Sequence, residues 1–101
     1  MPIDGIWHLA ISTPMGLHGG TLRLAVRDHE LTGEIQGRGG VQTLLGGEIV
    51  GGDLFWAIDA ATGAIEFSAS VVGDTMTGEI QLSEFGDVTF VGSYVGPDVD
   101  V

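Results

Sequence analysis

The chain has 101 residues, of which 44% are hydrophobic and 18 are glycine. It can therefore bury the core of a single domain spanning residues 1–101, and it is too apolar to be disordered. Its 14 acidic and three basic side chains argue against binding nucleic acid or an anionic membrane surface. The lack of cysteine excludes disulfides and thiolate metal sites, and no apolar stretch approaches the ~18 residues of a membrane helix.

The first half of the chain predicts four β-strands, because its apolar residues recur at every second position. A glycine-rich loop at Pro14–Gly20 separates the first two strands, and a tight turn at Asp28-His29 leads to the third. After the loop Gly37–Gly40 comes a strand around Val41–Val50, and Gly51-Gly52 is a hairpin turn that needs positive φ. The shared faces of the first three strands are Trp7, Leu9, Ile11; Leu22, Leu24, Val26; and Leu31, Gly33, Ile35.

The second half predicts four further strands with the same alternation. A turn at Gly73-Asp74 and a loop at Ser83–Asp87 separate the later ones, and the last strand covers Val88–Val95. No segment keeps the apolar spacing of a helix, so we expect none longer than one turn. The shared faces of the first three strands of this half are Leu54, Trp56, Ile58; Ile65, Phe67, Ala69, Val71; and Met76, Gly78, Ile80.

An internal repeat relates the two halves. Leu31–Gln36 recurs as Met76–Gln81 with five identical residues and one Leu/Met exchange, at an offset of 45. Weaker matches extend on both sides. The chain is therefore interpreted as two copies of a four-strand unit, residues 4–50 and 51–96.

Eight short strands joined by hairpins predict an all-β fold, an eight-stranded antiparallel up-and-down barrel built from the two repeats. Closing the sheet removes its edges, and eight strands leave an interior that side chains fill or one small ligand occupies. Gly33 and Gly78 face inward, either for close packing or to leave space for a ligand. The other residues expected inside are Trp7, Leu9, Ile11, Leu24, Ile35, Trp56, Ile58, Phe67 and Ile80.

Trp7 followed by Ser12-Thr-Pro-Met-Gly16, together with the repeated Leu/Met-Thr-Gly-Glu-Ile strand, resembles short bacterial β-barrel proteins with a Thr-Pro-Met-Gly loop. That group looks like a small relative of the calycin or streptavidin type of barrel. The second copy reads Ala61-Thr-Gly63 at the place of the tetrapeptide. The resemblance implies the barrel and no catalytic residues, because no settled activity is known for the group.

One rim of such a barrel collects the longer loops, which are the usual place for function. His18 is a candidate general base and Arg38 a candidate anion ligand; alternatively both are solvated loop residues. The two tryptophans either line an apolar ligand pocket or only fill the hydrophobic core. The three histidines lack zinc-ligand spacing, so neither a metal nor a cofactor is expected. The predicted ligand-binding residues are Trp7, Met15, His18, Arg38, Trp56 and Phe85.

The outer face of the predicted barrel carries apolar residues, including Ile6 and Phe55 and, on the last strand, either Val91 and Val95 or their neighbours of opposite parity. Contiguous exposed apolar surface marks interfaces, so we expect a homodimer through the barrel walls. Residues 51–101 hold nine acids and no base, which indicates a solvated acidic surface or recognition of a basic partner. The N-terminus shows no secretory pattern, and a cytoplasmic location is expected.

Three functions fit these features, and whether the protein is an enzyme stays open. The first is a small-molecule binding protein that holds an apolar or aromatic ligand in or at the mouth of the barrel. The second is a small cofactor-free lyase, isomerase or cyclase that uses the same cavity, with His18 and Arg38 as its polar groups. The third is a protein-interaction domain.

Overall fold

The computed structural model describes residues 3–37, 40–60, 63–82 and 86–97, and these form strands and turns without a helix. None of the described segments is a helix long and apolar enough to cross a bilayer. The strands are β1 (Gly5–Thr13), β2 (Gly16–Arg27), β3 (Glu30–Gly37), β4 (Gly40–Thr43), β5 (Leu45–Val50), β6 (Asp53–Ala60), β7 (Gly63–Val72), β8 (Thr75–Leu82) and β9 (Gly86–Gly96).

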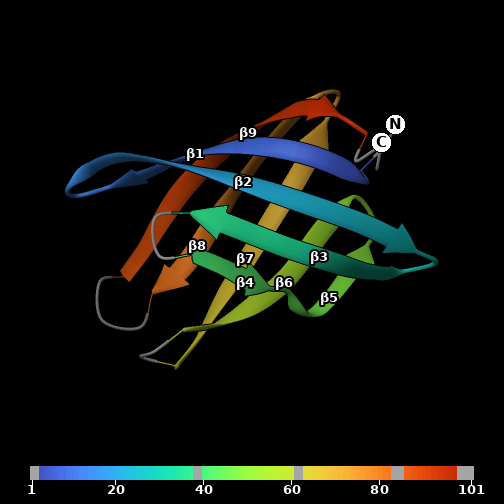
Figure 1. The fold of residues 1–101 in the computed structure, drawn as a ribbon, viewed down its shortest axis with the longest axis horizontal. Coiled ribbons are helices and arrows are strands. Elements are labelled where there is room, and N and C mark those ends of the chain that lie inside the picture. Colours follow the sequence, from blue (N-terminus) through green and yellow to red (C-terminus); the bar gives the residue numbers. More distant parts are fainter. Residues whose placement is uncertain (1–2, 38–39, 61–62, 83–85, 98–101) are drawn as a thin grey trace.

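The strands close into an antiparallel up-and-down barrel (Figure 1). Consecutive strands pair as hairpins except β4 and β5, and β9 returns to pair with β1. Both β4 and β5 pair with β3, so together they fill one of eight positions around the barrel. The predicted fold is confirmed, and it is consistent with the calycin-like architecture that the resemblance implies.

The predicted strand Val41–Val50 is interrupted, because Leu44 turns into the core. Its backbone N–H donates to the Gly33 carbonyl oxygen at 3.0 Å, and its side chain is buried. The chain then bulges: the β5–β6 register shifts between Leu45 and Glu48, and Gly46 takes a φ of 58°. Bulges bend a strand, and this one divides the wall into β4 beside the end of β3 and β5 beside β6.

The predicted loop Pro14–Gly20 is wrong, because β2 already begins at Gly16. The turn after β1 is held by Thr13, whose Oγ1 donates to the Gly16 carbonyl oxygen at 2.8 Å and accepts the Met15 N–H at 3.2 Å. The backbone N–H and C=O groups of glycine pair with a neighbouring strand without needing a side chain, so a glycine-rich sequence by itself does not define a loop.

The tight turns were predicted correctly. Asp28 adopts a φ of 59°, Gly51 of 63° and Gly73 of 62°. Left-handed backbone costs least at glycine and is tolerated by Asp, so these residues fix the sharp reversals between β2 and β3, β5 and β6, and β7 and β8.

The barrel interior is filled by apolar side chains. All nine side chains predicted to face inward belong to the core or pack against it. A Cβ at Gly33 would overlap the Arg23 carbonyl oxygen, and one at Gly78 would overlap that of Ser68. Close packing therefore accounts for Gly78, and Gly33 combines close packing with a positive φ of 143°. The buried residues are Trp7, Leu9, Leu22, Leu24, Leu31, Leu44, Leu54, Trp56, Phe67, Ala69, Met76, Ile80, Val88 and Phe90.

The two halves have matching strand registers at several positions. Leu24 lies opposite Gly33 in the β2–β3 pair, as Ala69 lies opposite Gly78 in the β7–β8 pair. The internal repeat itself stays a prediction from the sequence.

Candidate functional site

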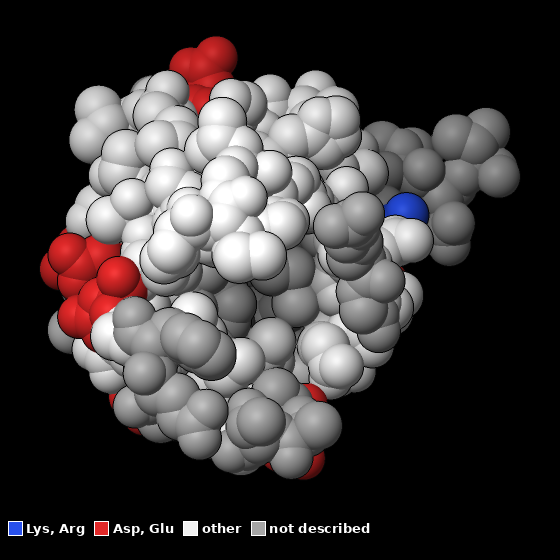
Figure 2. Space-filling model, turned by 90° about the vertical axis from the view of Figure 1, so that its left-hand side faces the viewer, with Lys and Arg blue, Asp and Glu red and all other residues white. Residues whose placement is uncertain are grey.

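One end of the barrel holds the last residues of β1, β3, β6 and β8 and the first residues of β2, β4, β7 and β9, and we call it the mouth. It is the left-hand end in Figure 1, where the β1–β2 hairpin projects. Figure 2 looks at this end and shows mainly uncharged side chains near its centre, with acidic side chains toward the periphery.

A hollow of about 570 Å³ lies at the mouth, where β1, β2 and β3 meet, and we call it the mouth hollow. A hollow of this size is within the range of small-molecule sites. Its lining is formed by Ile11, Leu17, His18, Gly19, Gly20, Ile35, Gln36 and Gly37.

His18 is the titratable side chain in the lining of this hollow. It lies on β2 directly opposite Ile11 on β1, and it shares the strand face of Gly20 and Leu22. That face is inward, since Leu22 is buried. His18 is half-buried rather than a freely solvated loop residue, so its imidazole is placed to offer a hydrogen bond beside apolar surface.

Glycines keep the mouth hollow open. Pairing between β2 and β3 begins at Thr21, so Gly19 and Gly20 belong to the part of β2 that pairs with β1. At Gly37, the last residue of β3, an added Cβ would meet nothing within 4 Å. Backbone and open space thus occupy positions that larger side chains would otherwise fill.

The structure places the other predicted site residues apart from one another. Met15 is 89% exposed at the tip of the β1–β2 hairpin. Trp7 is 0% exposed, and its indole Nε1–H donates to the Ile3 carbonyl oxygen at 2.9 Å. Arg38 and Phe85 lie outside the described residues. Ligand contacts by all of these residues stay predictions.

Trp56 is 3% exposed and sits in an aromatic cluster in the core. Its ring stacks on Phe67 at a centroid distance of 5.2 Å and meets the edge of Phe90 at 6.4 Å. Its buried Nε1–H has no hydrogen-bond partner among the described residues, in contrast to that of Trp7. The two tryptophans fill the barrel, and they differ in whether their polar atom is satisfied.

Titratable side chains do not gather into a metal centre in the part of the chain that the structure describes. No group of three or more His, Asp or Glu residues is close enough there to hold an ion. The candidate site thus combines His18 and the side-chain amide of Gln36 with apolar and backbone groups.

Several lining residues of the mouth hollow were missed as site residues from the sequence. Ile11 and Ile35 were assigned to the core alone, and Leu17, Gly19 and Gly20 were read as loop. The alternation of Leu24 and Leu22 continues through Gly20 to His18, and extending that period would have found the inward face of β2. No protein-family model matches the chain, and no curated protein sequence matches it.

Proposed function

We propose that this protein binds a small, largely apolar molecule with one polar end at the mouth of the barrel. The observation that carries the proposal is the mouth hollow, where His18 lies beside the apolar side chains Ile11, Leu17 and Ile35. Small-molecule sites combine apolar lining with a few placed polar groups, and this hollow has that composition.

Binding fits the mouth hollow better than catalysis. Acid–base catalysis of a lyase or isomerase type generally uses an acid and a base in defined positions. The described lining of the hollow supplies one titratable side chain, His18, and the amide of Gln36. These groups suit the recognition of a polar end, such as a carboxylate or hydroxyl, by hydrogen bonding.

The test is a titration of ¹⁵N-labelled protein with 1-naphthoate, followed by amide chemical shifts. Naphthoate joins an apolar bicyclic ring to a carboxylate, and acetate at the same concentration is the matched probe without the ring. We expect naphthoate to shift the amides of Ile11, His18, Gly20 and Gly37, and acetate to leave them unchanged. Equal responses to both probes, or naphthoate shifts confined to the outer wall, would overturn the proposal.

A variant checks the role of His18. Leucine at this position keeps the apolar bulk and removes the hydrogen bond, so we expect His18→Leu to weaken naphthoate binding about tenfold, which corresponds to roughly 1.4 kcal/mol. The exposed His8 on the outer face of β1 provides the matched control, and His8→Leu should bind naphthoate as the parent protein does.

A further inference from the structure

A second surface lies on the outside of the barrel, away from the mouth hollow. The strand registers align one row of outward side chains across five strands. Glu48 on β5 stands opposite Phe55 on β6, Phe55 opposite Ser68 on β7, Ser68 opposite Glu79 on β8, and Glu79 opposite Thr89 on β9. We call these five residues the transverse row.

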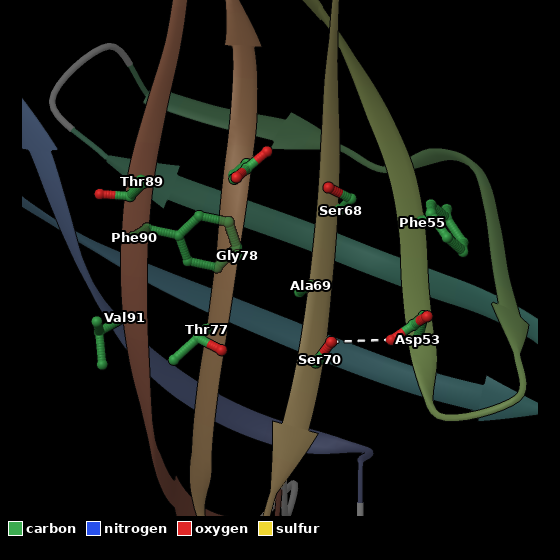
Figure 3. A pocket seen from close by; sticks show the side chains of 11 residues that line it. Asp53, Phe55, Ser68, Ala69, Ser70, Thr77, Gly78, Thr89, Phe90 and Val91 are labelled. Carbon is green, nitrogen blue, oxygen red and sulfur yellow. Dashed lines mark hydrogen bonds between the residues drawn. The ribbon is translucent and has the colours of Figure 1, made fainter.

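The transverse row runs through two hollows in the outer wall, of about 590 and 520 Å³. Phe55 and Ser68 line both, so the hollows adjoin at these two residues. Figure 3 shows the lining of the larger hollow on β6–β9, where the Ser70 hydroxyl is hydrogen bonded to Asp53 Oδ1 at 2.8 Å. Phe55 is 39% exposed, so an aromatic ring stands at the junction of the two hollows.

Carboxylates line both of the hollows that adjoin at this ring. The larger hollow contains Asp53 and Glu79, and the smaller one contains Glu48 and Glu66. All four are exposed, and residues 51–101 contain no lysine or arginine. An aromatic face bordered by carboxylates attracts a guanidinium or ammonium group, through the ring quadrupole and through the opposite charges.

The cross-strand neighbours of Glu48 place its carboxylate next to a second carboxylate. Glu48 lies between Phe55 on β6 and Glu30 on β3. Like charges directly opposite each other in a sheet are destabilising. Glu30 has the cation Arg27 opposite it on its other side. The two cross-strand neighbours of Glu48, in contrast, are the acidic Glu30 and the aromatic Phe55. A bound cation beside Glu48 would relieve this repulsion.

We propose that the transverse row binds an extended basic segment of a partner protein, with an arginine placed over Phe55. Neighbouring strands are about 4.8 Å apart, which puts Glu48 and Glu79 roughly 14 Å from each other. Side chains on one face of an extended segment repeat about every 6.7 Å, so cationic residues at positions i and i+4 match these two carboxylates. The span is too long for a single small cation and suits a peptide.

A second copy of this chain fits the row less well. A two-fold contact centred on Phe55 would bring the surrounding carboxylates of both copies together, and like-charge juxtaposition across an interface is unfavourable. A basic partner instead meets opposite charge at every acidic position of the row.

The experiment uses a blocked eight-residue peptide of alternating Arg and Ser, with binding measured by isothermal titration calorimetry and mapped by amide chemical shifts. We expect binding at low salt with shifts along the transverse row. The double variant Glu48→Gln/Glu79→Gln should lose affinity at least tenfold, and Phe55→Ser about threefold. The double variant Asp4→Asn/Asp74→Asn removes the same charge from residues that line neither hollow, and it should bind within twofold of the parent. Dispersed amide spectra establish that each variant is folded.

Four results would overturn the proposal. The first is an equal loss of affinity in both double variants, which means that net charge alone attracts the peptide. The second is a shift map centred on the mouth. The third is that spermine produces the same amide shifts and loses them in the Glu48→Gln/Glu79→Gln variant. The row would then be a site for small amines. The fourth is a dimer mass in native mass spectrometry that the peptide does not dissociate, which assigns the row to a second copy.

Discussion

The ring of Phe90 occupies the space that a side chain at Gly78 would need. The two residues stand opposite each other in the β8–β9 pair, and a Cβ at position 78 would lie 2.6 Å from Phe90 Cζ. Phe90 in turn meets Phe67 edge to face at 6.1 Å. The aromatic cluster of the core therefore depends on glycine at this position.

The Gly78→Ala variant should be destabilised by about 1–3 kcal/mol, since overpacking a core costs this much and here the new methyl also meets backbone. Urea denaturation measures the effect. Gly52→Ala is the control, because a Cβ there meets nothing within 4 Å and its φ is not positive. A loss of stability at Gly78 no larger than that at Gly52 would contradict the packing role.

The two tryptophans form a matched pair for testing the value of a buried hydrogen bond. Trp→Phe removes the same atoms at both positions. At Trp7 it also removes the bond to the Ile3 carbonyl oxygen, whereas at Trp56 it removes an unpartnered donor. We expect Trp7→Phe to cost about 1 kcal/mol more free energy of unfolding than Trp56→Phe. Equal losses would show that the Nε1–H of Trp56 has a partner of equal value, such as a bound water.

Much of the barrel was predictable from the sequence because two signals are local. Alternation placed Trp7, Leu9 and Phe67 inside, since each strand has one face on the core. Turn chemistry placed the reversals at Asp28 and Gly51, because few residues accept positive φ. Eight such strands have few ways to hide their edges, and closure is one of them.

The candidate site was less predictable because it depends on register. His18 was noticed for its chemistry, but its neighbours Ile11 and Ile35 come from other strands, and only the pairing brings them together. Glycines also give little indication of whether a segment forms a strand or a loop. The run at Gly19-Gly20 was interpreted as loop, and it forms strand because backbone hydrogen bonds to β1 need no side chain.

A side chain that fills the mouth hollow should block ligand binding there. Gly37→Leu places a side chain where an added Cβ meets nothing within 4 Å, so we expect stability to change by less than about 1 kcal/mol. Naphthoate binding should fall at least tenfold, as measured by the same amide titration. Gly52→Leu adds the same side chain at the opposite end of the barrel and should leave binding unchanged. Undiminished binding by the Gly37 variant would place the ligand elsewhere.

The opposed carboxylates of Glu30 and Glu48 predict a stability effect that is independent of any partner. Neutralising one of them removes the repulsion, so Glu48→Gln should raise the free energy of unfolding by a few tenths of a kcal/mol at low salt. Glu79→Gln is the control, because its cross-strand neighbours Ser68 and Thr89 are uncharged. The gain at Glu48 should vanish near 1 M salt, where the Debye length is about 3 Å. If both variants gain equally, the cause is the net charge of the chain. A gain confined to Glu48 would mean that the parent protein keeps a destabilising carboxylate at this position, in agreement with the proposed role of Glu48 in binding a basic partner.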